Sequence, residues 1–201
     1  MTPLQLLEKV YQEINKTDCR YAVCGGLAAS YYRSRPRLTN DADLLFKDRS
    51  LEQTKKTAEK IINKIGYKVV VGWISSQRRD FPSKVALIIG QMPGQELSST
   101  IDFLLPVFPW FENALERAKD NLLNYGFAKL PTITIEDIIV AKLFSLAIEP
   151  SRFSDLDDLK SIFLANHNLD LAYLSGQCES LALIVPREIS SFAPKALKRF
   201  K

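Results

Sequence analysis

Hydrophobic positions along the first two-thirds of the chain switch repeatedly between helical and strand spacing. Apolar residues at every third or fourth position predict an amphipathic helix over residues 3–15, and the apolar run of residues 21–24 predicts a buried strand that ends at two glycines. Residues 41–46 alternate acidic and apolar side chains and predict a second strand. The same patterns predict helices over 27–32, 50–65 and 110–118, strands over 67–74, 84–89 and 99–105, and one or two short strands within 121–133.

Helical spacing alone governs the last third of the chain. Thr134, with Asp137 three residues later, resembles a capped helix start, and helical patterning then runs on with a break near Pro150. We therefore predict an α+β fold in two regions. Residues 1–133 form a mixed β-sheet flanked by helices, and residues 134–201 form a C-terminal helical region.

Composition and charge narrow the classes of protein to which the chain can belong. Its 201 residues are 46% hydrophobic and 25% charged, which is typical of a folded domain and not of a disordered chain. The net charge of +4 permits an anionic ligand without itself indicating nucleic acid. The most apolar stretch, residues 135–148, is interrupted by charged side chains, and the N-terminal pattern is not that of a secretory leader. We therefore expect no membrane span and a cytoplasmic protein.

Cysteine and histidine usage excludes several kinds of site. The three cysteines form no Cys-x-x-Cys pair, so neither a disulfide framework nor a zinc site is predicted. The one histidine, His167, is expected in a loop and excludes catalytic arrangements that need two histidines. Large aromatic residues are expected in the core rather than as platforms for stacked bases, and these are Trp73, Phe108, Trp110 and Phe111.

Three aspartates on predicted strands are the strongest chemical signal. Asp41 and Asp43 lie two residues apart, so on a strand their side chains project from the same face. Asp102 lies in another, otherwise apolar strand, where a charge needs a partner. Carboxylates held close together repel one another and favour a bound cation, and oxygen ligands of this kind suit magnesium. The three acids predict a site for two divalent ions, as in phosphoryl transfer.

The neighbouring motifs decide how strongly Asp41 and Asp43 indicate a functional site. Taken alone, an Asp-x-Asp strand is more often a strand edge with an exposed side chain. Gly25 and Gly26, however, lie between a predicted strand and a predicted helix, where glycine allows close backbone approach and a helix start offers N–H groups to a phosphate. The order Gly-Gly, Asp-x-Asp, Asp therefore predicts backbone donors for phosphates, carboxylates for metals and a third acid near the attacking group.

These motifs resemble the nucleotidyltransferase superfamily that has the DNA polymerase β type palm, and within it the AbiEii/AbiGii toxin-like branch. The resemblance covers most of residues 1–165. The matching segments are YAVCGGLA at residues 21–28, RLTNDADL at 37–44, TIEDIIVAKL at 134–143, and Arg152 followed by DLDDL at 155–159. The resemblance implies that the α/β region is a palm-like nucleotidyltransferase domain.

The resemblance also implies a role for each matched residue. Catalysis and metal binding would fall to Asp41, Asp43 and Asp102, the last of which would also help to deprotonate the acceptor hydroxyl. Nucleotide binding would fall to Gly25, Gly26, Arg37, Thr39 and Lys142. Lys142 would reach the triphosphate or hold the acidic side chains in place. The implied cofactor is Mg²⁺, as two ions that Mn²⁺ can replace.

The chain departs from the superfamily pattern at Leu27, where a serine usually follows the glycines and contacts the phosphates. We expect phosphate binding to rest more on backbone N–H groups and basic side chains. Arg33, Arg35 and Arg37 form either an electropositive rim for a triphosphate or an RNA, or a solvated loop.

Asp155 and Asp158 lie three residues apart on one face of a predicted helix. Helix capping with ion pairing to Arg152 or Lys160 explains them at least as well as catalysis does.

The leading hypothesis is an enzyme that transfers a nucleoside monophosphate from an NTP to a hydroxyl of RNA, such as tRNA, or of a protein. Within the resemblance, it would be the toxin of a toxin–antitoxin or phage-defence system, with an antitoxin as a further partner. The alternative is a catalytically inactive nucleotide-binding or protein-interaction module on the same fold, which the missing serine motivates.

Overall fold

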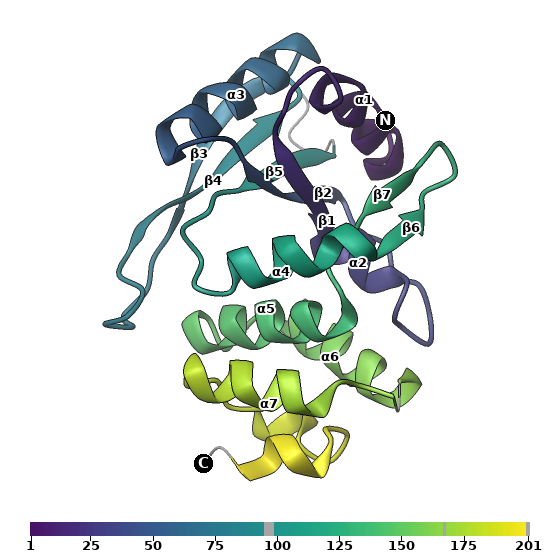
Figure 1. Cartoon of the computed structure of the whole chain (residues 1–201), viewed down its shortest axis with the longest axis vertical. Coiled ribbons are helices and arrows are strands. Elements are labelled where there is room, and N and C mark those ends of the chain that lie inside the picture. Colours follow the sequence, from purple (N-terminus) through teal and green to yellow (C-terminus); the bar gives the residue numbers. More distant parts are fainter. Residues whose placement is uncertain (95–98, 167, 200–201) are drawn as a thin grey trace. The chain divides into compact units, whose positions relative to one another are not determined.

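The computed structural model describes residues 1–94, 99–166 and 168–199 (Figure 1). The expectation for His167 lies outside the described residues. The chain divides into two compact units. The first unit comprises Met1–Ala28 and Leu38–Ile133, and the second comprises Ala29–Arg37 and Thr134–Lys201.

A five-stranded mixed sheet forms the centre of the first unit. Its strands are β1 (Arg20–Cys24), β2 (Asp41–Lys47), β3 (Lys68–Ile74), β4 (Lys84–Gln91) and β5 (Thr100–Leu104). They follow the order β1-β2-β5-β4-β3, in which β2 and β5 are parallel and the other neighbours are antiparallel. The predicted α+β class with a mixed sheet is therefore confirmed.

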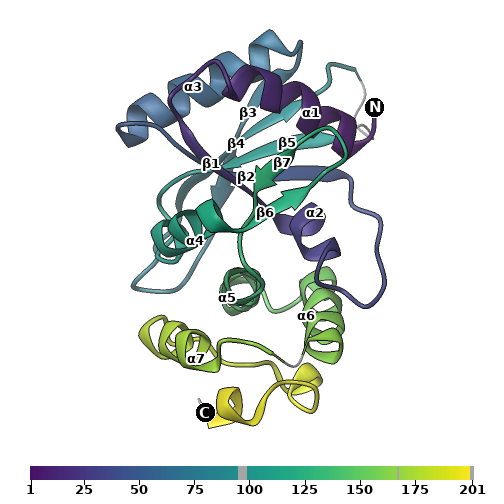
Figure 2. The same cartoon turned by 45° about the vertical axis from the view of Figure 1, so that its right-hand side comes forward.

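Two amphipathic helices cover one face of this sheet. Helix α1 (Pro3–Ile14) contacts β2 and β5, and α3 (Leu51–Lys64) contacts β2, β3 and β4 (Figures 1 and 2). Both begin where the sequence predicts, because the side chains of Thr2 and Ser50 accept hydrogen bonds from backbone N–H groups of the first turn. Their buried apolar faces form the core together with the sheet.

Shorter elements complete the first unit. Helix α4 (Phe111–Arg117) contacts β1 from the side opposite α1 and α3, and it leads through η1 (Ala118–Asp120) into the small hairpin of β6 (Leu122–Asn124) and β7 (Lys129–Pro131). These elements confirm the short helix and short strands that the sequence predicts in this region. Helix α2 (Gly25–Ser30) begins directly at the first glycine, two residues earlier than predicted.

Two local predictions are wrong. Strand β4 runs to Gln91, two residues beyond the predicted strand of residues 84–89, so Gly90 lies inside it. A Cβ atom at Gly90 would lie 2.7 Å from the Ile101 side chain, and only glycine fits that gap. Trp73 is not a core residue: it is 67% exposed, because β3 is an edge strand of the sheet. Phe108, Trp110 and Phe111 are buried as expected.

Helices make up most of the second unit. These are α5 (Ile135–Ile148), α6 (Phe153–Ala165) and α7 (Leu171–Ser180), with the short turns η2 (Arg187–Ile189) and η3 (Lys195–Arg199). Helix α5 packs against both α6 and α7, and it is apolar on most sides because it is the central helix of this unit. In the part of the chain that the structure describes, no helix combines the length and apolar character that a membrane crossing requires.

Candidate active site

The parallel pairing of β2 and β5 brings the three predicted acids together. Asp43 lies opposite Asp102 in the register of the two strands, and Asp41 lies opposite Thr100. Their neighbours Ala42 and Ile101 are fully buried, so the acids project from the opposite face of the sheet. One face of two adjacent strands therefore carries all three carboxylates.

A hydroxyl group links two of these carboxylates. The Thr100 Oγ1 atom lies 2.9 Å from Oδ1 of Asp41 and 3.1 Å from Oδ1 of Asp102. A threonine hydroxyl has one proton to donate and lone pairs to accept, so it can join two acid groups when one of them is protonated. Thr100 thus holds the side chains of Asp41 and Asp102 in a fixed relation.

The electrostatics of the cluster favour a bound cation. Burial, followed by the negative charges of Asp43 and Asp41, raises the pKa of Asp102 to about 7. Among the described residues, neither Asp41 nor Asp102 forms an ion pair with a lysine or an arginine. Negative charge at this face is therefore not neutralised by cationic side chains in contact with those two acids.

The donor chemistry fits a magnesium ion. Carboxylate oxygens are the ligands that Mg²⁺ prefers, and the ion needs only one or two of them because water and substrate phosphates complete its shell. Among residues 1–94, 99–166 and 168–199, no group of three or more acidic, histidine or cysteine side chains is arranged to hold a metal ion by itself. Asp41, Asp43 and Asp102 offer the oxygen donors that such an ion takes alongside water and substrate phosphates.

The glycines lie directly against this cluster. The Gly26 N–H donates a 3.4 Å hydrogen bond to Oδ2 of Asp43, and Cys24 of β1 pairs with Asp43 across the sheet. Gly25 has a φ angle of +60°, and a Cβ atom there would lie 1.9 Å from Oδ2 of Asp43. Only glycine allows this turn from β1 into α2 and this approach of the backbone to the carboxylate.

Two other predicted nucleotide-binding residues meet in the second unit. Lys142 of α5 is 7% exposed, and its Nζ atom lies 2.6 Å from Asp158 and 2.7 Å from Asp155. Arg37 also binds Asp158, with its Nε atom 2.7 Å from Oδ1. Arg33 forms a further ion pair with the same carboxylate. Asp158 therefore joins three cationic side chains at one buried point.

The pKa of Asp158 follows from this arrangement. Burial acts to raise the pKa, but the hydrogen bond from Arg37 and the charge of Lys142 outweigh it and hold the pKa below its usual value. Asp155 pairs with Arg152 as well as Lys142, while Lys160 lies over the ring of Phe192. Ion pairing with Arg152 thus agrees with one of the two alternatives for Asp155, and Lys160 takes no part.

The sequence predicts most of these site residues but not all of the contacts among them. Of the predicted nucleotide-binding residues, Thr39 lies close to the acidic strand and its hydroxyl is 3.4 Å from the backbone oxygen of Asp41. Thr100 is a site residue that the motifs do not predict, although its position two residues before Asp102 puts both side chains on one face of the strand. The pairing of Arg33 with Asp158 joins residues 125 positions apart, and no local pattern indicates such a contact.

A comparison with known protein families shows to which family the chain belongs. The model of the family described as "Nucleotidyl transferase AbiEii toxin, Type IV TA system" matches residues 10–199. The chain belongs to the AbiEii nucleotidyltransferase toxin family. It is accordingly an enzyme of nucleotidyl transfer, and the resemblance inferred from its motifs is confirmed. No relative is found among curated protein sequences.

Solved structures confirm the fold. The crystal structure of ANT(2'')-Ia in complex with adenylyl-2''-tobramycin is 14% identical, with a TM-score of 0.60 over 89% of this chain and 95% of that one. The solution structure of the antibiotic-resistance factor ANT(2'')-Ia is 15% identical, with a TM-score of 0.56 over 89% of this chain and 88% of that one. At such identities the likeness concerns the fold alone.

Proposed function

We propose that this AbiEii-family enzyme is a Mg²⁺-dependent nucleotidyltransferase that modifies a hydroxyl of RNA, with tRNA as the first candidate and a protein as the second. It would act as the toxin of a toxin–antitoxin or phage-defence system, and an antitoxin would be its regulatory partner. The observation that carries the proposal is the convergence of Asp41, Asp43 and Asp102 on one sheet face beside Gly26.

The residues divide the chemical work among them. Asp41 and Asp43 would hold the metal ions, which when bound supply positive charge to the reacting phosphates. The acceptor oxygen forms a bond to the α-phosphorus, the bond from that phosphorus to the bridging oxygen breaks, and pyrophosphate leaves. Asp102 takes the proton of the acceptor hydroxyl, a role for which its place opposite Asp43 on the same sheet face suits it.

Nucleotide binding would rest on backbone and cationic groups. Gly25 and Gly26 would contribute backbone N–H groups to the phosphates at the start of α2, where the absence of a side chain on Gly25 leaves room for the Asp43 carboxylate. Thr39 stands two residues before β2 in the sequence. Arg37 and Lys142 would act with the part of their charge that Asp158 leaves uncompensated in the second unit. Leu27 supplies no hydroxyl, which places more of the phosphate binding on N–H groups than in relatives with serine.

A transfer screen tests this proposal. Each of the four α-labelled NTPs is incubated with the enzyme and with total tRNA, total cell protein or tobramycin as acceptor. We include tobramycin because a structural neighbour is recorded with adenylyl-2''-tobramycin. The proposal predicts Mg²⁺-dependent labelling of tRNA, abolished by EDTA and restored by added Mg²⁺ or Mn²⁺. Labelling of protein alone would move the acceptor to the second candidate. Labelling of tobramycin alone, or transfer in EDTA, would contradict the proposal.

A further inference from the structure

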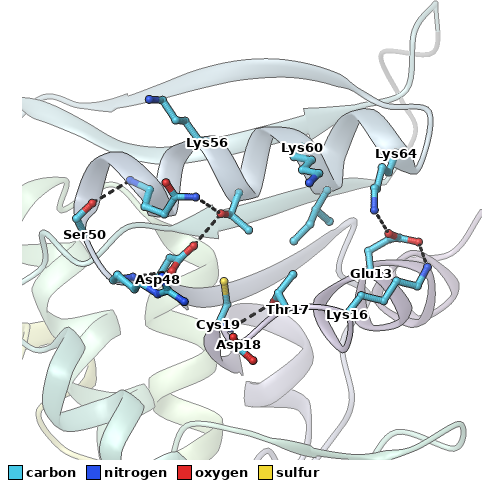
Figure 3. Close-up of a pocket in the computed structure, with 14 residues that line it drawn as sticks. Glu13, Lys16, Thr17, Asp18, Cys19, Asp48, Ser50, Lys56, Lys60 and Lys64 are labelled. Atoms are coloured by element: carbon cyan, nitrogen blue, oxygen red, sulfur yellow. Dashed lines mark hydrogen bonds and ion pairs between the residues drawn. The ribbon is translucent and has the colours of Figure 1, made fainter.

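A cavity of about 600 Å³ lies in the first unit at the end of β2 remote from the acids (Figure 3). Asp41 begins β2, whereas Asp48 and Arg49 follow its last residue, Lys47, and line the cavity. Asp48 lies five residue steps from Asp43 and seven from Asp41, a span of about 17–23 Å along the strand direction. A single nucleotide bound at the acids therefore cannot also fill this cavity.

Cationic side chains dominate the lining of the cavity. Five of them reach it from the end of α1, the start of α3 and one face of α3, and they are Lys16, Arg49, Lys56, Lys60 and Lys64. The three lysines of α3 are four residues apart, so they follow one face of the helix with a rise of roughly 6 Å between neighbours. They form a row of positive charges about 12 Å long.

The acids that face the cavity leave part of this charge uncompensated. Glu13 is shared by two lysines, with 2.5 Å to Lys16 and 3.1 Å to Lys64 (Figure 3). The carboxylate of Asp48 accepts hydrogen bonds from the Arg49 N–H and the Thr57 hydroxyl rather than from a cationic side chain.

The third acid, Asp18, is exposed and makes no ion pair among the described residues. Neither Arg49 nor Lys60 has an ion-pair partner in that part of the chain. Lys56 pairs with Glu52, which lies outside the lining, at 3.5 Å. Against the five lining cations, the three lining carboxylates and Glu52 leave an excess of one positive charge.

We infer that this cavity binds the phosphodiester backbone of the acceptor RNA at a point remote from the reacting hydroxyl. The inference rests on the proposed function, in that the acceptor is RNA. A row of lysines on one helix face matches a chain of phosphates better than a single phosphate group, because the charges are spread over several nucleotide rises. Only a macromolecular acceptor can reach both the acids and a cavity about 20 Å away.

Equilibrium binding of a labelled tRNA tests the inference without requiring transfer. The test variant is Arg49→Ala with Lys60→Ala, which removes the two cations that have no ion-pair partner among the described residues. The matched control is Lys55→Ala, on the same helix but outside the cavity lining. We expect the test variant to weaken tRNA binding about tenfold at 0.1 M salt and to reduce the slope of log K against log salt by about 2. The control should bind like the parent.

Competition and a thiol footprint separate the remaining sources of phosphate. Cys19 lines the cavity and is half-buried, whereas Cys24 and Cys178 are buried, so Cys19 is the thiol open to slow alkylation. Bound tRNA should protect Cys19, and free ATP or tripolyphosphate should not. Unchanged tRNA binding in the test variant, or no protection of Cys19 by tRNA, would overturn the inference. Loss of ATP binding with tRNA binding intact would overturn it too. None of these results depends on nucleotidyl transfer, so the proposed activity is judged separately.

Discussion

Gly25 shows how one residue type is fixed by two constraints at once. Its φ angle of +60° disfavours any side chain, and a Cβ atom would strike the Asp43 carboxylate. Gly66 ends α3 with a φ angle of +80°, but nothing lies within 4 Å of its Cβ position. The two glycines therefore share the backbone constraint and differ in the contact with the acid.

We expect Gly66→Ala to lower the free energy of unfolding by about 1–2 kcal/mol, because it places a side chain at positive φ. Gly25→Ala should lower it by more, because the same backbone strain is joined by the clash with Asp43. Only Gly25→Ala should also lower nucleotidyl transfer, by roughly 100-fold or more, because it displaces Asp43. Chemical denaturation and a transfer assay measure the two effects. Equal transfer rates in the two variants would show that the close contact with Asp43 does not matter.

The raised pKa of Asp102 predicts a pH dependence of stability in metal-free protein. Below about pH 4 the carboxyl is protonated in both the folded and the unfolded chain. Between about pH 4 and pH 7 only the folded chain holds the proton, so this group contributes stability that is lost as pH rises toward 7.

Asp102→Asn removes that contribution. In EDTA, the variant should therefore gain stability relative to the parent as the pH rises from 4 to 7, and added Mg²⁺ should stabilise the parent more than the variant. Thermal unfolding across this pH range checks both expectations. A stability difference that does not change with pH would mean that Asp102 ionises as an ordinary carboxyl.

Between elements, Asp158 of α6 joins Lys142 of α5 to Arg33 and Arg37 of the segment before β2. The side chain of Asp158 is fully buried, so loss of its charge removes from a buried place the carboxylate that these three cations share. The neighbouring Asp157 also pairs with Arg33, at 2.7 Å, but its side chain is 61% exposed. The two adjacent aspartates therefore offer a matched comparison.

Asp158→Asn should lower the free energy of unfolding by about 3 kcal/mol, the typical effect of breaking a buried ion pair. Asp157→Asn should change it by less than about 1 kcal/mol, because water already screens that pair. Urea denaturation of the two variants gives both numbers. Similar values for the two would argue that the buried cluster contributes little to stability.

Prediction from sequence succeeded where the signal is local and failed where it depends on pairing. The bounds of α1, α3 and β2 follow from the spacing of apolar residues and from helix caps, and the sequence itself shows the acidic residues of β2. The position of β3 at the sheet edge cannot be predicted in this way, because strand order depends on contacts between residues distant in sequence. The prediction that Trp73 lies in the core is wrong for this reason.

The candidate site shows the same division between local and distant signals. The motif predicts Asp41, Asp43 and Asp102 as a set, and their adjacency needs the parallel β2–β5 pairing that only the fold supplies. The link through Thr100 and the convergence of Arg37 and Lys142 on Asp158 depend likewise on packing.

For the whole molecule, the fold brings an acidic centre and a basic cavity to opposite ends of one strand. A net charge of +4 therefore conceals two regions of opposite sign: a negative one, to which our proposal assigns metal and nucleotide, and a positive one, to which it assigns RNA. The proposed transfer from an NTP to an RNA would use such a division.

The central claim is that the acidic cluster carries out nucleotidyl transfer. It is tested most directly with the double variant Asp41→Asn and Asp43→Asn, by measuring the transfer of label from an α-labelled NTP. The two substitutions keep the shape of the side chains and remove two of the three negative charges of the cluster, so the fold should remain, as circular dichroism can verify. The account predicts that transfer to the acceptor found in the screen falls below detection, with Lys55→Ala as an active control. Transfer by the double variant at the rate of the parent would contradict the account.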